Sequence, residues 1–302
     1  MHSQLARPAI HRRQSAGGSE ICLQSTEAFV ITFLVSATKS GELLMSRCVA
    51  GIILLVALAD VARAAPVATY QFNNTFGAAE AGRPALFPIS GATSLFQNDL
   101  VFGQNRRVWS FNGFADPHFA QAGLLLDTST IISPSSYSVE MIFRFTEDNG
   151  SWRRVIETAF QQSDNGLYVE PANNLQVYPD LTGVGSDWTE GEYHHMILTN
   201  DGNNVAAYLD GELEFAGTST WMRLDNASNP GRYMVFFVDN SPGTGVSDEY
   251  ANGRVSLIRL WNHILTAAEA QQLSAAARVP EPASAWLVVL GLAMCFPMRR
   301  SR

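Results

Sequence analysis

Apolar and polar residues alternate along most of the chain between residues 65 and 278. In the clearest stretch every second position carries a large apolar side chain, and these positions are Tyr137, Val139, Met141, Phe143 and Phe145. Because successive side chains of a strand point to opposite faces, a period of two places all five on one face of a β-strand. Ile142 alone breaks the alternation. The pattern predicts a strand with one buried face.

Shorter segments with the same alternation follow, and turn sequences separate them. The turns contain glycine, asparagine or aspartate, which tolerate a positive φ. We predict strands over residues 153–158, 166–169, 175–178, 193–199, 205–209, 212–216, 232–238 and 254–261. Many short strands at this spacing favour an all-β fold, either a two-sheet sandwich or a barrel.

One helix is expected at the end of this region. Thr266 and Glu269 have the spacing of a capping box, in which the hydroxyl and the carboxylate each accept a hydrogen bond from a free backbone N–H. Residues 267–277 are rich in strong helix formers. This helix either covers the fold or leads to the C-terminal segment.

The C-terminal segment, residues 279–302, has the composition of a membrane-directed signal. Pro280, Glu281 and Pro282 precede 16 uncharged residues, 283–298, and Arg299 and Arg300 follow. As a helix the uncharged run is about 24 Å long, and it spans a bilayer core of about 30 Å if the arginines extend to the lipid head groups. The positive-inside rule then places the preceding domain outside the membrane. An ordinary C-terminal anchor is the alternative.

A second apolar segment has the features of a signal peptide over residues 45–64. Met45 and Arg47 precede an apolar core at 49–59, and Ala62 and Ala64 form the small-x-small site after which signal peptidase cuts. The mature chain would begin at residue 65. Residues 1–44 would then be an extension upstream of the true start, or else a cytoplasmic segment with residues 51–59 as an internal anchor.

The domain between these segments, residues 65–278, is expected to lack cysteine and to carry a negative net charge. Cys22, Cys48 and Cys295 all fall in the segments expected to be absent from it, so it would contain no thiol and no disulfide. Residues 65–279 hold 11 Arg, no Lys and 23 Asp plus Glu, a formal net charge of −12. This charge argues against nucleic acid and anionic lipid as partners, and it is compatible with divalent cations or neutral glycans.

The order of parts in residues 279–302 resembles the PEP-CTERM sorting signal of Gram-negative bacteria. The resemblance implies recognition by an exosortase at Pro280, Glu281 and Pro282. It also implies transient anchoring in the inner membrane through the C-terminal helix, removal of the tail, and export to the cell surface or the extracellular exopolysaccharide matrix.

The domain itself resembles the laminin-G-like, concanavalin A-like jelly rolls. The resemblance rests on residues 193–198 followed by 208–213, with an Asp-Gly turn, and on the closing stretch 252–269. Residues 109–113 are similar to an early strand of that family. The family implies a two-sheet antiparallel sandwich with a short C-terminal helix, and it includes both lectins and glucanases.

Two sets of residues are candidates for ligand binding. Aromatic rings in or beside the predicted loops can stack on sugars, and they are Trp152, Tyr178, Trp188 and Trp221. Loop oxygens suited to Ca²⁺, the one candidate cofactor, come from Asp239, Asn240, Asp248 and Glu249. His194 and His195 are adjacent on a strand and face opposite ways, so they do not act as a pair.

These features favour a non-catalytic protein that binds carbohydrate or another matrix component. A structural or adhesive module without a ligand pocket is the first alternative. A glycoside hydrolase is the second, although the glucanase pattern of Glu, one residue, Asp, two residues, Glu is missing from the sequence. Glu212 and Glu214 share a strand face, and we expect them to protect a sheet edge.

Overall fold

The computed structural model describes residues 65–89, 95–113, 121–148, 150–184, 188–239 and 249–279. The chain divides into two units, Met1–Arg63 and Ala64–Arg302, and the first lies wholly outside these ranges. The signal-peptide and sorting residues Ala62, Ala64, Pro280, Glu281, Pro282, Arg299 and Arg300 also lie outside them. Within the described residues no helix is long and apolar enough to cross a membrane.

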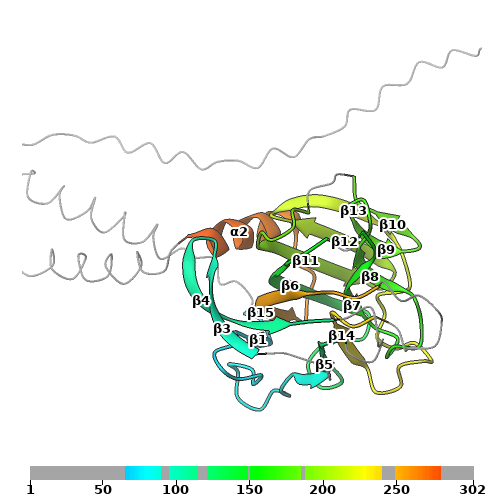
Figure 1. The fold of residues 1–302 in the computed structure, drawn as a ribbon. Helices are drawn as coiled ribbons and strands as arrows, with labels where there is room; N and C mark the ends of the chain where they lie inside the picture. Colours follow the sequence, from blue (N-terminus) through cyan, green and yellow to red (C-terminus); the bar gives the residue numbers. More distant parts are fainter. Residues whose placement is uncertain are drawn as a thin grey trace, which may run out of the picture. The chain divides into compact units, whose positions relative to one another are not determined.

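The described chain forms two antiparallel sheets that pack face to face as a jelly-roll sandwich (Figure 1). The first sheet has eight strands in the order β13-β12-β11-β6-β15-β4-β3, with β1 paired to β15. Their bounds are β1 Ala68–Tyr70, β3 Leu95–Val101, β4 Gln104–Phe111, β6 Ser136–Phe145, β11 His194–Asp201, β12 Asn204–Leu209, β13 Glu212–Thr218 and β15 Gly253–Trp261.

The second sheet has seven strands in the order β10-β9-β8-β7-β14-β5-β2. Their bounds are β2 Phe87–Ile89, β5 Gly123–Asp127, β7 Arg153–Glu157, β8 Gly166–Val169, β9 Leu175–Tyr178, β10 Leu181–Thr182 and β14 Tyr233–Phe236. Strands β7, β8 and β9 are consecutive in the sequence and adjacent in this sheet, so their outward side chains form one continuous surface.

The core lies between the sheets, and the predicted strand at its centre is confirmed. Strand β6 contributes all five alternating apolar residues, from Tyr137 to Phe145, to one buried cluster. Ile142 points to the other face, where it packs in a separate small cluster with Tyr193 and Leu257. The exception to the alternation therefore has a cause, because the outer face of this sheet is itself covered.

Helix α2, Ala267–Arg278, supplies part of that cover (Figure 1). Its Leu273 and Ala270 pack with Ile197 and Trp261 on the outer face of the eight-stranded sheet. The predicted capping box is present: Glu269 N–H donates to Thr266 Oγ1, and Thr266 N–H donates to the Glu269 carboxylate. The helix therefore covers the fold, which was one of the two expected roles.

Candidate functional site

Three aromatic side chains gather on the outer face of the seven-stranded sheet, and we call them the aromatic cluster: Trp152, Tyr168 and Tyr178. Leu167 and Val169 of β8 point into the core, so Tyr168 between them points outward. The ring of Trp152 lies 5.4 Å from that of Tyr168 and 5.3 Å from that of Tyr178, both nearly edge to face. Tyr168 is buried, whereas Trp152 and Tyr178 are partly exposed.

A buried arginine lies beneath this cluster. The guanidinium of Arg154 stacks over the Tyr168 ring at 4.4 Å, and its Nε donates to Asp239 Oδ1 at 2.7 Å. Arg154 also donates to the carbonyl oxygen of Asn165 at 3.0 Å. Only 1% of Arg154 and 4% of Asp239 is exposed, so the two charges neutralise each other inside the protein. Burial tends to lower the pKa of Arg154, but Tyr168, Asp239 and Glu157 raise it overall.

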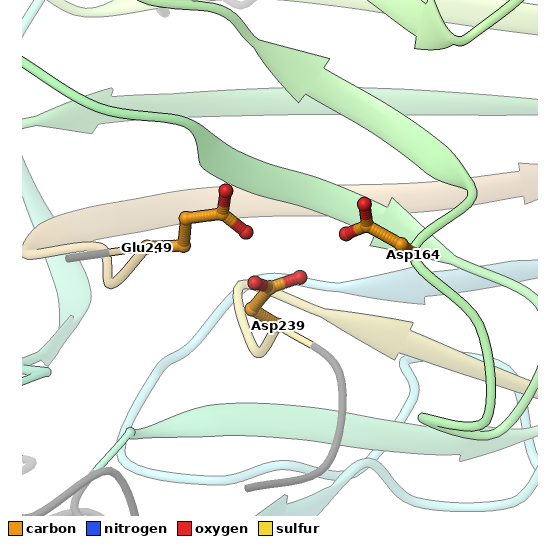
Figure 2. A group of neighbouring side chains, drawn as sticks. All are labelled: Asp164, Asp239 and Glu249. Carbon is orange, nitrogen blue, oxygen red and sulfur yellow. The ribbon is translucent and has the colours of Figure 1, made fainter. Parts of the chain in front are cut away.

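Two further carboxylates meet Asp239 beside Arg154, and we call the three the acidic trio: Asp164, Asp239 and Glu249. Figure 2 shows the three side chains converging, and one oxygen of each lies within 4.8 Å of the others. Asp164 is exposed, and Glu249 is partly buried. Burial raises the pKa of Glu249 to about 8, and its hydrogen bond to Asp239 and the negative charges of Asp239 and Asp164 act in the same direction.

The acidic trio fits a calcium ion poorly. Asp239 Oδ1 already accepts from Arg154 and, at 3.0 Å, from the Tyr168 hydroxyl. Burial and the hydrogen bond to Asp239 raise the pKa of Glu249, which favours its protonated form. Calcium prefers several free, ionised oxygens, and here a guanidinium supplies the positive charge instead. Of the four predicted metal ligands, Asp239 and Glu249 come together as expected, while Asn240 and Asp248 lie outside the described residues.

The structure separates the four aromatic candidates. Trp152 and Tyr178 lie in the aromatic cluster. Trp188 lies in a loop as predicted, but it is 2% exposed and packs in the core against Phe143 at 4.8 Å and His194 at 4.5 Å, so it is not available to stack on a sugar. Trp221 is 39% exposed in the connection between β13 and β14.

The two adjacent histidines and the two glutamates of β13 do not form a catalytic or metal-binding arrangement in the described structure. His194 hydrogen-bonds with Asp210 at 2.8 Å, and His195 bonds with the buried Glu140 at 3.0 Å on the opposite face, as predicted. Glu214 is buried, whereas Glu212 is exposed. A bulge between Ala207 and Tyr208 of the partner strand shifts their register, and the two glutamates therefore do not form an open pair of carboxylates.

Sequence reasoning missed Arg154, Asp164 and Tyr168. A signal existed for two of them. Arg154 stands inside a predicted strand, where a buried charge needs a partner, and Tyr168 alternates with Leu167 and Val169, which places it outward.

The family comparison agrees with this fold. Residues 120–271, half of the chain, match a laminin-G-type family model described as the concanavalin A-like lectin/glucanases superfamily, and the chain therefore belongs to that superfamily. This confirms the resemblance drawn from the strand and turn sequences. A search of curated proteins finds no match.

Solved structures share the fold at low identity. One is domain 4 of AbnA, a GH43 extracellular arabinanase from Geobacillus stearothermophilus, solved in complex with arabinotriose. The two chains are 16% identical with a TM-score of 0.50, and the match covers 69% of this chain and 98% of that domain. Botulinum neurotoxin type C, whose cell entry depends on interaction with two ganglioside molecules, is 12% identical, with a TM-score of 0.49. That match covers 71% of this chain and 51% of the toxin chain.

Proposed function

We propose that this domain binds neutral polysaccharide without catalysis, through the aromatic cluster on the outer face of the seven-stranded sheet. The observation that carries the proposal is the pair of partly exposed rings, Trp152 and Tyr178, held 5.3 Å apart by packing against each other. Exposed aromatic rings in fixed positions stack on the apolar faces of sugars. The net charge of −12 over residues 65–279 favours neutral over anionic polymers.

We propose binding rather than hydrolysis because the glucanase pattern of Glu, one residue, Asp, two residues, Glu is missing from the sequence. Glycoside hydrolysis needs one carboxylic acid and one free carboxylate facing each other across the sugar, about 5 to 9.5 Å apart. In the acidic trio, burial favours the protonated form of Glu249, which donates a hydrogen bond to Asp239, and Asp239 also accepts one from Arg154. Asp164 is the exposed member, and its Oδ1 lies 3.2 Å from the Tyr168 hydroxyl oxygen.

Polysaccharide binding is tested by depletion and by titration calorimetry with arabinan, xylan, mixed-linkage β-glucan and the anionic polymer alginate. Arabinan is included because the similar arabinanase domain was solved with arabinotriose. We expect saturable binding to at least one neutral polymer and none to alginate. Trp152→Ala and Tyr178→Ala should each weaken binding about tenfold, which corresponds to about 1.4 kcal/mol.

Leu100→Ala is the matched control, because Leu100 is 68% exposed on the other sheet. If wild-type protein attaches to matrix material but shows no saturable binding to any neutral polymer, the alternative of an adhesive module without a ligand pocket replaces this proposal. Release of reducing sugar from any polymer would identify a hydrolase.

We further infer that the protein is exported and sorted as a PEP-CTERM substrate, with residues 45–64 and 279–302 as its two signals. The support is the sequence alone: Ala62 and Ala64 at one end, and Pro280, Glu281 and Pro282 followed by an uncharged run and Arg299 and Arg300 at the other. Intact mass and cell fractionation test both steps in a host with and without its exosortase. A mature form that begins at Ala65 and lacks the tail supports the inference, and a cytoplasmic chain with both segments refutes it.

A further inference from the structure

A further exposed aromatic ring lies near the end of strand β7, and neither the sequence nor the site described above accounts for it. Phe160 lies in the turn after β7, three residues past Glu157, and is 41% exposed. Its φ is +53° and that of Gln161 is +59°, a left-handed conformation that costs free energy in a non-glycine residue. The ring of Phe160 packs on Tyr233 with centroids 5.0 Å apart and planes inclined by 32°.

The turn that carries Phe160 is held from below by buried polar groups. The carboxylate of Glu157, which is fully buried, accepts hydrogen bonds from the N–H groups of Ala159 and Gln161, the latter at 2.9 Å. The carbonyl oxygen of Thr158 accepts from Asn229 Nδ2 at 2.7 Å, and that of Trp221 accepts from Thr158 Oγ1 at 2.6 Å. The ring is therefore fixed at the surface before any ligand arrives.

This turn lies on the same face as the aromatic cluster. Met234 and Phe236 of β14 point into the core, so Tyr233 points outward. Gln161 Nε2 donates to the carbonyl oxygen of Asp239 at 3.4 Å, which brings the turn against the acidic trio. The backbone from Trp152 to the end of β7 at Glu157 covers about 17 Å. Val235 of β14 pairs with Glu157, so Tyr233, on which Phe160 packs, lies past that end of β7.

We propose that Phe160 and Tyr233 form a second sugar-stacking platform, so that this face holds an extended polysaccharide chain rather than a single terminal sugar. The proposal rests on the function proposed above and adds the length of the ligand. A sugar ring fits better than a protein partner, since a stable protein interface buries about 800 Å² on each side and this platform offers two rings. Polar groups surround the rings, as sugar hydroxyls require, including Gln161 and the exposed Gln162.

The variant Phe160→Gly tests the platform without threatening the fold. Glycine adopts a positive φ readily, so it removes the ring and relieves the left-handed strain together. Full-length protein is titrated with arabinobiose and arabinohexaose, and with cellobiose and cellohexaose. We expect wild-type protein to bind one hexamer at least tenfold more tightly than its dimer, and Phe160→Gly to lose that advantage. Phe160→Tyr should keep it, and Leu100→Ala should bind as wild type.

The outcomes separate the two proposals. Equal affinity of wild-type protein for hexamer and dimer, or unchanged hexamer affinity in Phe160→Gly, overturns the second platform and leaves the polysaccharide-binding function standing. No binding of any oligosaccharide or polymer by wild-type protein overturns both. If Phe160→Gly instead loses binding to hexamer and dimer alike, the ring belongs to a single short site, and the extended-chain proposal is wrong.

Discussion

Replacing Arg154 by methionine should be among the most damaging single changes on the outer face of the seven-stranded sheet. Methionine keeps an unbranched chain of comparable reach, so it fills much of the same space while removing the charge. The change leaves Asp239, which is 4% exposed, without the cation that contacts it at 2.7 Å. It also removes the stack over Tyr168 and the hydrogen bond to Asn165.

The size of the effect follows from these contacts. At 2.7 Å and an effective dielectric constant of about 20, the attraction between the two charges is roughly 6 kcal/mol, and part of it offsets the cost of burying both groups. Breaking a buried ion pair from one side typically costs about 3 to 5 kcal/mol. We therefore expect Arg154→Met to lower the free energy of unfolding by about 4 kcal/mol. With a urea slope of about 2 kcal/mol per M, the unfolding midpoint falls by about 2 M.

Urea unfolding followed by tryptophan fluorescence measures this shift. Arg223→Met is the control, because the Arg223–Asp225 pair is about one-third exposed and should cost less than about 1 kcal/mol. The double variant Arg154→Met/Asp239→Leu removes both buried charges and should recover most of the loss. If Arg154→Met is as stable as the control variant, or the double variant is no better than the single one, the ion pair does not stabilise this face as we argue.

Four other changes have defined outcomes. Burial raises the pKa of Glu249 to about 8 in the folded state, whereas the unfolded chain loses this proton above about pH 4.3. The free energy of unfolding should therefore fall as the pH rises from about 4.3 to 8. Glu249→Gln should flatten this fall, measured by urea unfolding at each pH. Chelation by EDTA or addition of Ca²⁺ should leave the unfolding midpoint unchanged, because Arg154 provides the positive charge beside Asp239; a rise of several degrees with Ca²⁺ would show an ion site. Thr266→Ala should cost about 1 kcal/mol by removing the helix cap, and Thr266→Ser should cost much less. Gly253→Ala should cost about 1 to 3 kcal/mol, because a Cβ there meets the carbonyl oxygen of Arg144 at 2.4 Å and the Phe111 ring at 2.5 Å; wild-type stability in thermal unfolding would contradict the steric argument.

The sandwich was predictable where strands bury one face and leave the other polar. Strand β9 follows that rule. Strands β6 and β8 lie where the alternation of their sequences predicts, although their second faces are largely buried too. Strand β3, Leu95–Val101, was missed because it is a partly exposed edge whose residues show no alternation of buried and exposed positions. Strand β2 has only three residues and includes Pro88, which weakens any strand signal.

The candidate site was only partly predictable, because its key contacts join distant parts of the chain. Trp152 and Tyr178 could be named as aromatic residues beside loops, but nothing local shows that they meet. Asp239 contacts Arg154 across 85 positions of sequence, so no spacing rule identifies it as the partner of a buried cation. The prediction for Trp188 failed for the opposite reason: its loop position is real, but the ring turns inward and packs on Phe143.

The two outer faces of the sandwich differ in what covers them. Helix α2 covers the outer face of the eight-stranded sheet, and its last residues are held there. Arg106 donates to the carbonyl oxygen of Ala277 at 3.3 Å, and Gln104 donates to that of Val279 at 2.9 Å. The aromatic cluster and Phe160 lie on the outer face of the other sheet. Val279, the last described residue, therefore lies on the side of the domain away from the proposed sugar-binding face.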